Sequence, residues 1–191
     1  MKVGLYFGSF NPIHHGHLLI ATYVLQHTNI QQVWFVVSPQ NPLKPTASLL
    51  NEYHRLHLVQ VAIEGARDLR ASDIEFRLPK PSFTVNTLAY LQEKYPVNEF
   101  SIIMGSDSFQ NLPKWKNGEW LLRNFPVYVY KRPGHLSLPL YEDAKEIHDL
   151  DAPLLPISST DIRKNIRESK SIRYLVPDTV REEIERNGYY R

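Results

Sequence analysis

Residues 3–17 read Val-Gly-Leu-Tyr-Phe-Gly-Ser-Phe-Asn-Pro-Ile-His-His-Gly-His. The apolar run Val3–Phe7 predicts a buried strand, and the spacing of apolar residues predicts a helix over Gly16–His27. A buried strand followed by a turn and a helix is the first half of a βαβ unit. In open α/β sheets, ligands bind beyond the carboxyl ends of the strands, so the turn between these two elements is the first candidate site.

The rest of the chain continues the alternation of strand and helix. Further strands are expected at Val33–Val37, Ser72–Phe76, Phe100–Met104 and Val127–Tyr130, and further helices at Glu52–Leu69, Val85–Tyr95, Thr160–Glu168 and Asp178–Asn187. Helices of this length between buried strands indicate parallel pairing. We therefore predict an α/β protein with a Rossmann-like, doubly wound, mainly parallel sheet and a small helical C-terminal subregion. No linker composition is visible, so residues 1–191 are expected to form a single domain.

Composition narrows the classes of function. The chain has 191 residues, 42% of them hydrophobic and 22% charged, as in ordinary globular proteins, and its net charge of +2 gives no support for nucleic-acid binding. The absence of Cys excludes disulfides, Cys-ligated zinc, iron–sulfur clusters and a thiol nucleophile. The longest apolar run, Val33–Val37, is too short to span a membrane, and the N-terminus lacks the pattern of a secretion signal. We expect a cytoplasmic protein that binds neither nucleic acid nor membrane.

Three of the eight His residues lie within residues 14–17. His14 and His17 would share a face of the first helical turn, where free backbone amides and the helix dipole favour an anion. Gly8 would let the backbone come close to a ligand. These features predict a phosphate site. Two other interpretations stay open at this point: a metal bound by the His-x-x-His pair, and His side chains that only cap and pack the helix.

A second segment, Ile157-Ser158-Ser159-Thr160-Asp161-Ile162-Arg163, carries hydroxyls and a guanidinium at a helix start. Ser158 fits an N-cap and Asp161 the third helical position of a capping box. Hydroxyls, amides and Arg163 together suit phosphate oxygens. The alternative is a well-capped helix with no ligand.

A third segment, Met104-Gly105-Ser106-Asp107, ends a buried strand and is followed by Trp115. Asp107 could accept hydrogen bonds from ribose hydroxyls or cap the next helix. Trp115, flanked by Lys114 and Lys116, could stack on a flat ligand or belong to the core.

Together these segments resemble the nucleotidyltransferase superfamily with the His-x-Gly-His signature, and within it the bacterial nicotinate mononucleotide adenylyltransferases. Residues 8–17 are similar to G-[TS]-F-[DN]-P-[IV]-H-x-G-H, and residues 157–163 match I-S-S-T-x-I-R in full. Residues 42–44, 82–87, 105–107 with Trp115, and 132–134 also resemble family motifs. The chain departs from the pattern at Phe7, where the family often has Gly, and at Leu43, where it usually has His.

The resemblance implies transfer of AMP from ATP to nicotinate mononucleotide by direct in-line attack, with release of pyrophosphate. The catalytic residues it implies are His14, His17 and Arg163. The ATP-binding residues it implies are Gly8, Ser9, Phe10, His14, His17, Gly105, Asp107, Ile157, Ser158, Ser159, Thr160 and Arg163. Those implied for nicotinate mononucleotide are Lys44, Thr84, Asp107, Trp115 and Arg132. Mg²⁺ is expected on the triphosphate oxygens, with no metal ligand from the protein.

Other functions are weighed against this one. A related transferase could use nicotinamide mononucleotide or phosphopantetheine, although residues 82–87 and Trp115 favour the nicotinate substrate. A nucleotide sensor would bind without turnover, and the intact His pair argues against it. A fragment that binds RNA, as in tRNA synthetases, is disfavoured by the near-neutral charge. Association into a homo-oligomer is left open.

Overall fold

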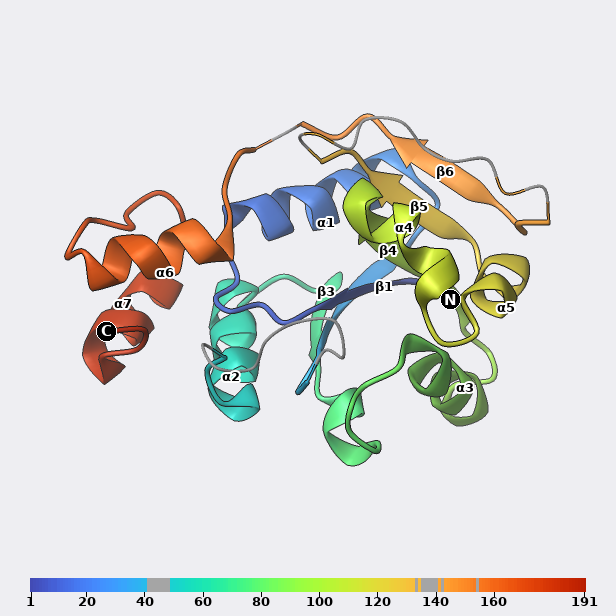
Figure 1. The fold of residues 1–191 in the computed structure, drawn as a ribbon, viewed down its shortest axis with the longest axis horizontal. Helices are drawn as coiled ribbons and strands as arrows, with labels where there is room; N and C mark the ends of the chain where they lie inside the picture. The colour runs from blue at the N-terminus through green and yellow to red at the C-terminus, as the bar shows by residue number, and fades with distance from the viewer. Residues whose placement is uncertain (41–48, 133, 135–140, 142, 154) are drawn as a thin grey trace.

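A parallel β-sheet runs through the centre of the computed structural model, which describes residues 1–40, 49–132, 134, 141, 143–153 and 155–191 (Figure 1). Within these ranges the strands are β1 (Lys2–Gly8), β2 (Gln32–Val37), β3 (Leu69–Ser72), β4 (Glu99–Gly105), β5 (Val127–Tyr130) and β6 (Ile147–Leu150). They lie in the order β3-β2-β1-β4-β5-β6, and each neighbouring pair is parallel. The predicted Rossmann-like sheet is confirmed.

Helices cover both faces of the sheet (Figure 1). Apolar residues of α1 (His15–His27), α2 (Glu52–Ala62), α6 (Ser159–Arg167) and α7 (Asp178–Asn187) form one buried cluster with Tyr6 and Phe35 of the sheet. Those of α3 (Thr84–Lys94), α4 (Ser106–Gln110) and α5 (Gly118–Asn124) form a second cluster with Leu5 and Trp34. Because side chains alternate along a strand, β1, β2, β4 and β5 contribute to both clusters. Among the described helices, none combines the length and the apolar character that crossing a bilayer would require.

The direction of winding reverses between β1 and β4. The chain passes from β1 outward to β2 and β3, then returns to place β4 on the other side of β1. The carboxyl ends of β1 and β4 therefore diverge into loops that leave a crevice between them. Gly8 and Gly105 are the last residues of these two strands, so the first and third predicted segments meet at this point.

Two predicted elements had wrong bounds, and one strand was missed. The helix predicted over Glu52–Leu69 ends at Ala62, and Gly65 turns the chain with a φ of 81°. Leu69 already belongs to β3, so the strand predicted at Ser72–Phe76 is displaced, and Ile74–Arg77 form a short 3₁₀ helix, η1. Strand β6 was not predicted at all. It pairs only with β5, at the edge of the sheet, and its polar sequence resembles a loop.

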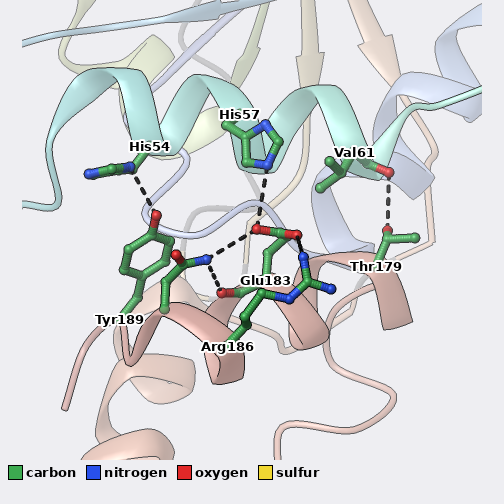
Figure 2. A network of polar contacts seen from close by, with 8 residues as sticks. His54, His57, Val61, Thr179, Glu183, Arg186 and Tyr189 are labelled. Carbon is green, nitrogen blue, oxygen red and sulfur yellow. Dashed lines mark hydrogen bonds and ion pairs between the residues drawn. The ribbon is translucent and has the colours of Figure 1, made fainter.

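The last helix, α7, and Tyr189 after it are attached to α2 (Figure 2). The Tyr189 hydroxyl lies 2.9 Å from Nδ1 of His54, and the Thr179 hydroxyl donates to the Val61 carbonyl at 3.0 Å. His57 faces Glu183 at 3.5 Å. Buried residues of α7 continue the cluster formed with α1 and α2, so the predicted helical C-terminal subregion shares their core. This attachment holds α6 beside the start of α1 (Figure 1).

A tight backbone contact supports the segment that carries Trp115. The short 3₁₀ helix η2 (Leu112–Lys114) precedes Trp115, and the Gly118 N–H donates to the Trp115 carbonyl at 3.0 Å. A Cβ at Gly118 would overlap the carbonyl oxygen of Leu112.

We expect Gly118→Ala to lower the free energy of unfolding by about 1–3 kcal/mol, because a backbone oxygen would have to move. Urea unfolding measures this.

The control for this prediction is Glu119→Ala, at the next, exposed position of α5. It should change the free energy of unfolding by less than about 0.5 kcal/mol. Equal effects of the two substitutions would show that η2 tolerates displacement.

Candidate active site

A cleft of about 980 Å³ opens at the carboxyl ends of β1, β4 and β5, between the starts of α3 and α6. Its volume suits a nucleotide-sized ligand. The predicted site residues that line it are Gly8, Ser9, Phe10, His14, His17, Thr84, Gly105, Asp107, Trp115, Arg132, Ser158, Ser159, Thr160 and Arg163. Segments far apart in the sequence are thus brought to one cavity.

Two of the predicted residues are not in this set. Ile157 packs against the first buried cluster and is absent from the cleft lining. Lys44 lies outside the described residues, so its predicted contact with phosphate stays a prediction.

His14 and His17 stand as a stacked pair at the start of α1. Their ring centroids are 3.7 Å apart, and His14 is the N-cap residue. The His14 backbone N–H donates to Nδ1 of His17 at 3.3 Å. A neutral imidazole that accepts at Nδ1 carries its proton on Nε2, so this hydrogen bond places the His17 proton on Nε2. The predicted shared face is confirmed.

His14 is neutral at pH 7. Burial lowers its pKa from the ordinary 6.5 to about 4, and the positive charges of Arg132 and His15 act in the same direction. The side chain is 6% exposed, and its Nδ1 has no hydrogen-bond partner in the described part of the chain. Gly16 makes room for it, since a Cβ there would lie 3.0 Å from that nitrogen. His14 can thus offer a ligand a neutral, desolvated imidazole rather than a fixed positive charge.

Gly8 and Phe10 shape the loop before this pair. Phe10 has a φ of 45°, which places its ring edge-on to the rings of Tyr6 and His17. A Cβ at Gly8 would lie 2.8 Å from the Phe10 ring. A side chain at position 8 would therefore collide with Phe10, which explains the glycine there without a ligand. The predicted close approach to a ligand is a second reason for it.

The start of α6 is bonded to the same loop. Ser159 donates from its hydroxyl to the Pro12 carbonyl at 2.9 Å, and Arg163 donates from Nη1 to the Asn11 carbonyl at 2.8 Å. Ser158 accepts from the backbone N–H of Asp161 at 3.1 Å, which confirms the predicted N-cap. Arg163 keeps further N–H groups for a ligand, because Nη1 alone is used by the loop and a guanidinium has five donors.

Asp107 and Arg132 face each other across the end of β4. Oδ1 of Asp107 lies 3.6 Å from Nε of Arg132, and the Arg132 backbone N–H donates to the Ser106 hydroxyl at 2.9 Å. Nη2 of Arg132 also donates to the Tyr130 hydroxyl at 3.3 Å. A Cβ at Gly105 would lie 2.5 Å from the Asp107 oxygen, so a larger residue here would displace the Asp107 side chain. Asp107 was predicted to bind both ATP and the mononucleotide, and Arg132 to bind the mononucleotide. The structure places the two side chains next to each other.

Sequence analysis missed Arg55, which positions the loop that carries Ser9. It is fully buried in α2 and donates to the carbonyls of Leu50 at 2.7 Å, Ser9 at 2.6 Å, Ser38 at 2.8 Å and Pro39 at 3.2 Å. The carbonyl acceptors lie on three separate segments. Burial lowers the pKa of this guanidinium, but an Arg stays protonated in proteins. No sequence motif could have indicated a role that depends on backbone carbonyls so far apart.

Glu75 was also missed. It is 2% exposed and lines the cleft, where its two oxygens accept from the hydroxyls of Ser38 at 2.7 Å and Thr87 at 2.8 Å. Burial raises the pKa of Glu75, while these hydrogen bonds oppose the rise. Glu75 thereby fixes the start of α3 against the end of β2.

A family model described as cytidylyltransferase-like matches residues 5–165. The chain belongs to the cytidylyltransferase-like family. Its match covers the whole cleft-forming part of the sheet, from β1 to the loop-binding residues of α6. Sequence relatives support a narrower resemblance within the family.

A protein of Flavobacterium psychrophilum named "probable nicotinate-nucleotide adenylyltransferase" is 49% identical over 100% of both chains. A protein of Cytophaga hutchinsonii with the same name is 49% identical over 100% of this chain and 98% of its own. These relatives confirm the predicted resemblance. A solved structure of nicotinic acid mononucleotide adenylyltransferase from Plasmodium falciparum, complexed with NaAD, has a TM-score of 0.84 at 21% identity and covers 99% of this chain and 97% of its own. At that identity it supports the fold.

In this cytidylyltransferase-like protein, the lowered pKa of His14 makes stability depend on pH. Between about pH 4 and 6.5 the unfolded chain binds a proton at His14 that the folded protein excludes, so stability rises with pH across this window. We expect His14 to contribute a rise of about 3 kcal/mol between these limits. Urea unfolding of wild type and His14→Gln at pH 4, 5, 6 and 7 measures it. Parallel curves for the two proteins would contradict the prediction, as would an NMR titration of His14 near its ordinary pKa.

Because Arg55 donates to several carbonyls, even its replacement by Lys should lower the stability of the fold strongly. An ammonium cannot reach carbonyls on three segments, so we expect Arg55→Lys to lower the free energy of unfolding by about 2–4 kcal/mol. Urea unfolding measures this, with Arg67→Lys at an exposed position as the control. A loss no greater than that of the control would show that water replaces the guanidinium.

Proposed function

We propose that the protein is an adenylyltransferase that transfers AMP from ATP to nicotinate mononucleotide, giving nicotinate adenine dinucleotide and pyrophosphate. The observation that carries the proposal is the convergence of the stacked His14–His17 pair and the start of α6 on one cleft. Two helix starts and several N–H and O–H donors there suit a polyphosphate. The names of full-length relatives at 49% identity support the choice of substrates.

The transfer is a direct displacement. An oxygen of the mononucleotide's 5′-phosphate attacks the α-phosphorus of ATP, the new P–O bond forms as the bond to the β-phosphate breaks, and pyrophosphate leaves. His17 donates from Nε2 to the triphosphate, and the hydroxyl of Thr160 and the free N–H groups of Arg163 hold the leaving pyrophosphate. Catalysis is then positioning plus stabilisation of developing negative charge, with no covalent intermediate on the protein.

Nicotinate mononucleotide lies at the other end of the cleft, towards α3. Thr84 is the first residue of α3, and its N-cap, Phe83, provides no side-chain hydrogen bond. The free amides of this helix start can donate to the nicotinate carboxylate. Trp115 packs against the second buried cluster and also lines the cleft, so one face of its ring can stack on the pyridine. Asp107 accepts from ribose hydroxyls, and Arg132 faces the mononucleotide.

Mg²⁺ would be held by phosphate oxygens of ATP. In the described part of the chain, two carboxylates line the cleft, and both are engaged: Asp107 with Arg132 and Glu75 with two hydroxyls. No group of three His, Asp or Glu side chains suited to a metal occurs among the residues that the structure describes. A cation on the triphosphate would neutralise charge there.

The single-domain organisation, the cytoplasmic location and the state of association stay predictions.

The alternatives are separated by one assay. Pyrophosphate release from ATP is measured with nicotinate mononucleotide, nicotinamide mononucleotide and phosphopantetheine in parallel. The proposal expects the first to react fastest. Faster reaction with another acceptor would reassign the substrate, and binding of ATP without pyrophosphate release would identify a sensor.

The assignment of His17 is tested by His17→Ala. We expect kcat to fall about 10²–10³-fold, because one donor to developing charge is lost, while the Kd of ATP changes less. Pyrophosphate release and isothermal titration measure the two quantities. The control is His27→Ala at the exposed far end of α1, where the ring stacks on Tyr23. A His17→Ala enzyme with more than half the wild-type kcat would overturn the assignment.

A further inference from the structure

Lys116 places a positive charge at the end of the cleft where α3 begins. Its Nζ lies 4.8 Å from the centre of the Phe83 ring, a distance at which an ammonium is attracted to an aromatic face. Both residues line the cleft, and Phe83 directly precedes Thr84 at the start of α3. Lys116 also follows Trp115 directly in the chain. The contact with Phe83 therefore places the ammonium in the same cleft lining as Thr84 and Trp115, the two residues proposed to bind the nicotinate ring.

Lys116 has no acidic partner among the described residues. The ion pairs found there do not include it, whereas Lys80 pairs with Glu52 at 2.7 Å and Lys131 with Asp149 at 3.5 Å. The two carboxylates of the cleft lining, Glu75 and Asp107, are engaged elsewhere. The charge of Lys116 is thus available to a ligand, and it adds to the positive end of the α3 dipole.

We propose that Lys116 is a specificity-determining residue, whose ammonium favours a mononucleotide with a carboxylate on its pyridine ring over the corresponding amide. The inference rests on the proposed function. A carboxylate and an amide have nearly the same shape, so packing against Trp115 cannot separate them. A fixed positive charge can, because it attracts the anion over several ångströms and gains little from a neutral amide.

If Lys116 attracts the ring carboxylate, loss of its charge should change KM and not kcat. The ring carboxylate is remote from the phosphorus that reacts, so its attraction to Lys116 is the same in the ground state and in the transition state. Removing that attraction raises KM and leaves kcat unchanged. A loss of kcat would instead indicate damage to the reacting centre.

The test compares Lys116→Met with Lys94→Met. Lys94 lies at the far end of α3, where its Nζ is 5.6 Å and 5.5 Å from the rings of Tyr90 and Tyr95, so the control removes the same charge from the same kind of contact. Neither Lys94 nor its two tyrosines line the cleft. With ATP saturating, kcat and KM are measured for both mononucleotides, and their Kd values are measured by titration.

We expect Lys116→Met to lower kcat/KM for nicotinate mononucleotide about tenfold, through KM, and to change that for the amide less than twofold. Lys94→Met should leave both unchanged, and Lys116→Arg should restore the preference. An unchanged ratio of acid to amide in Lys116→Met, or equal losses for both substrates, overturns the inference. If wild type turns over neither mononucleotide, the proposed function fails, and the Kd ratio still decides whether Lys116 selects the acid.

Discussion

The carbonyl groups of the loop between β1 and α1 are held by donors from outside the loop, and the site depends on this. Arg55 of α2 binds the Ser9 carbonyl, and Ser159 and Arg163 of α6 bind those of Pro12 and Asn11. An irregular loop cannot satisfy its own backbone polar groups, so buried carbonyls need such partners. With the loop fixed on both sides, the stacked His pair that follows it has one position relative to the cleft.

Residues at the start of α6 were interpreted either as a phosphate site or as a well-capped helix with no ligand. The structure makes the two roles compatible. Arg163 was expected to bind phosphate, and it also holds the loop. A guanidinium can do both, because its donors point in different directions from one rigid plane. The contacts of α7 with α2 also support this loop, because they keep α6 in place against it (Figure 2). Helix α6 therefore lines the cleft, and α7 supports it from behind.

A buried polar chain joins the two ends of the cleft. Ser38 donates its backbone N–H to the Gly8 carbonyl, accepts from Arg55 at its own carbonyl, and donates its hydroxyl to Glu75. Glu75 in turn accepts from Thr87 of α3. Every step is a short hydrogen bond between buried groups, and such bonds are costly to leave unmade. The loop between β1 and α1 and the start of α3 are thus held at a fixed separation by the end of β2.

The sequence by itself determined the features that depend on neighbouring residues. Continuous apolar runs predicted β1 and β2, and the spacing of His14 and His17 predicted their shared face. Ser158 was recognised as an N-cap because its partner lies only three residues away. The edge strand β6 was missed, since it has too little apolar pattern to distinguish it from a loop. Arg55 and Glu75 were decided only by the tertiary structure. Their partners lie up to 46 residues away, and a buried charge becomes favourable only where the folded chain assembles enough donors or acceptors around it.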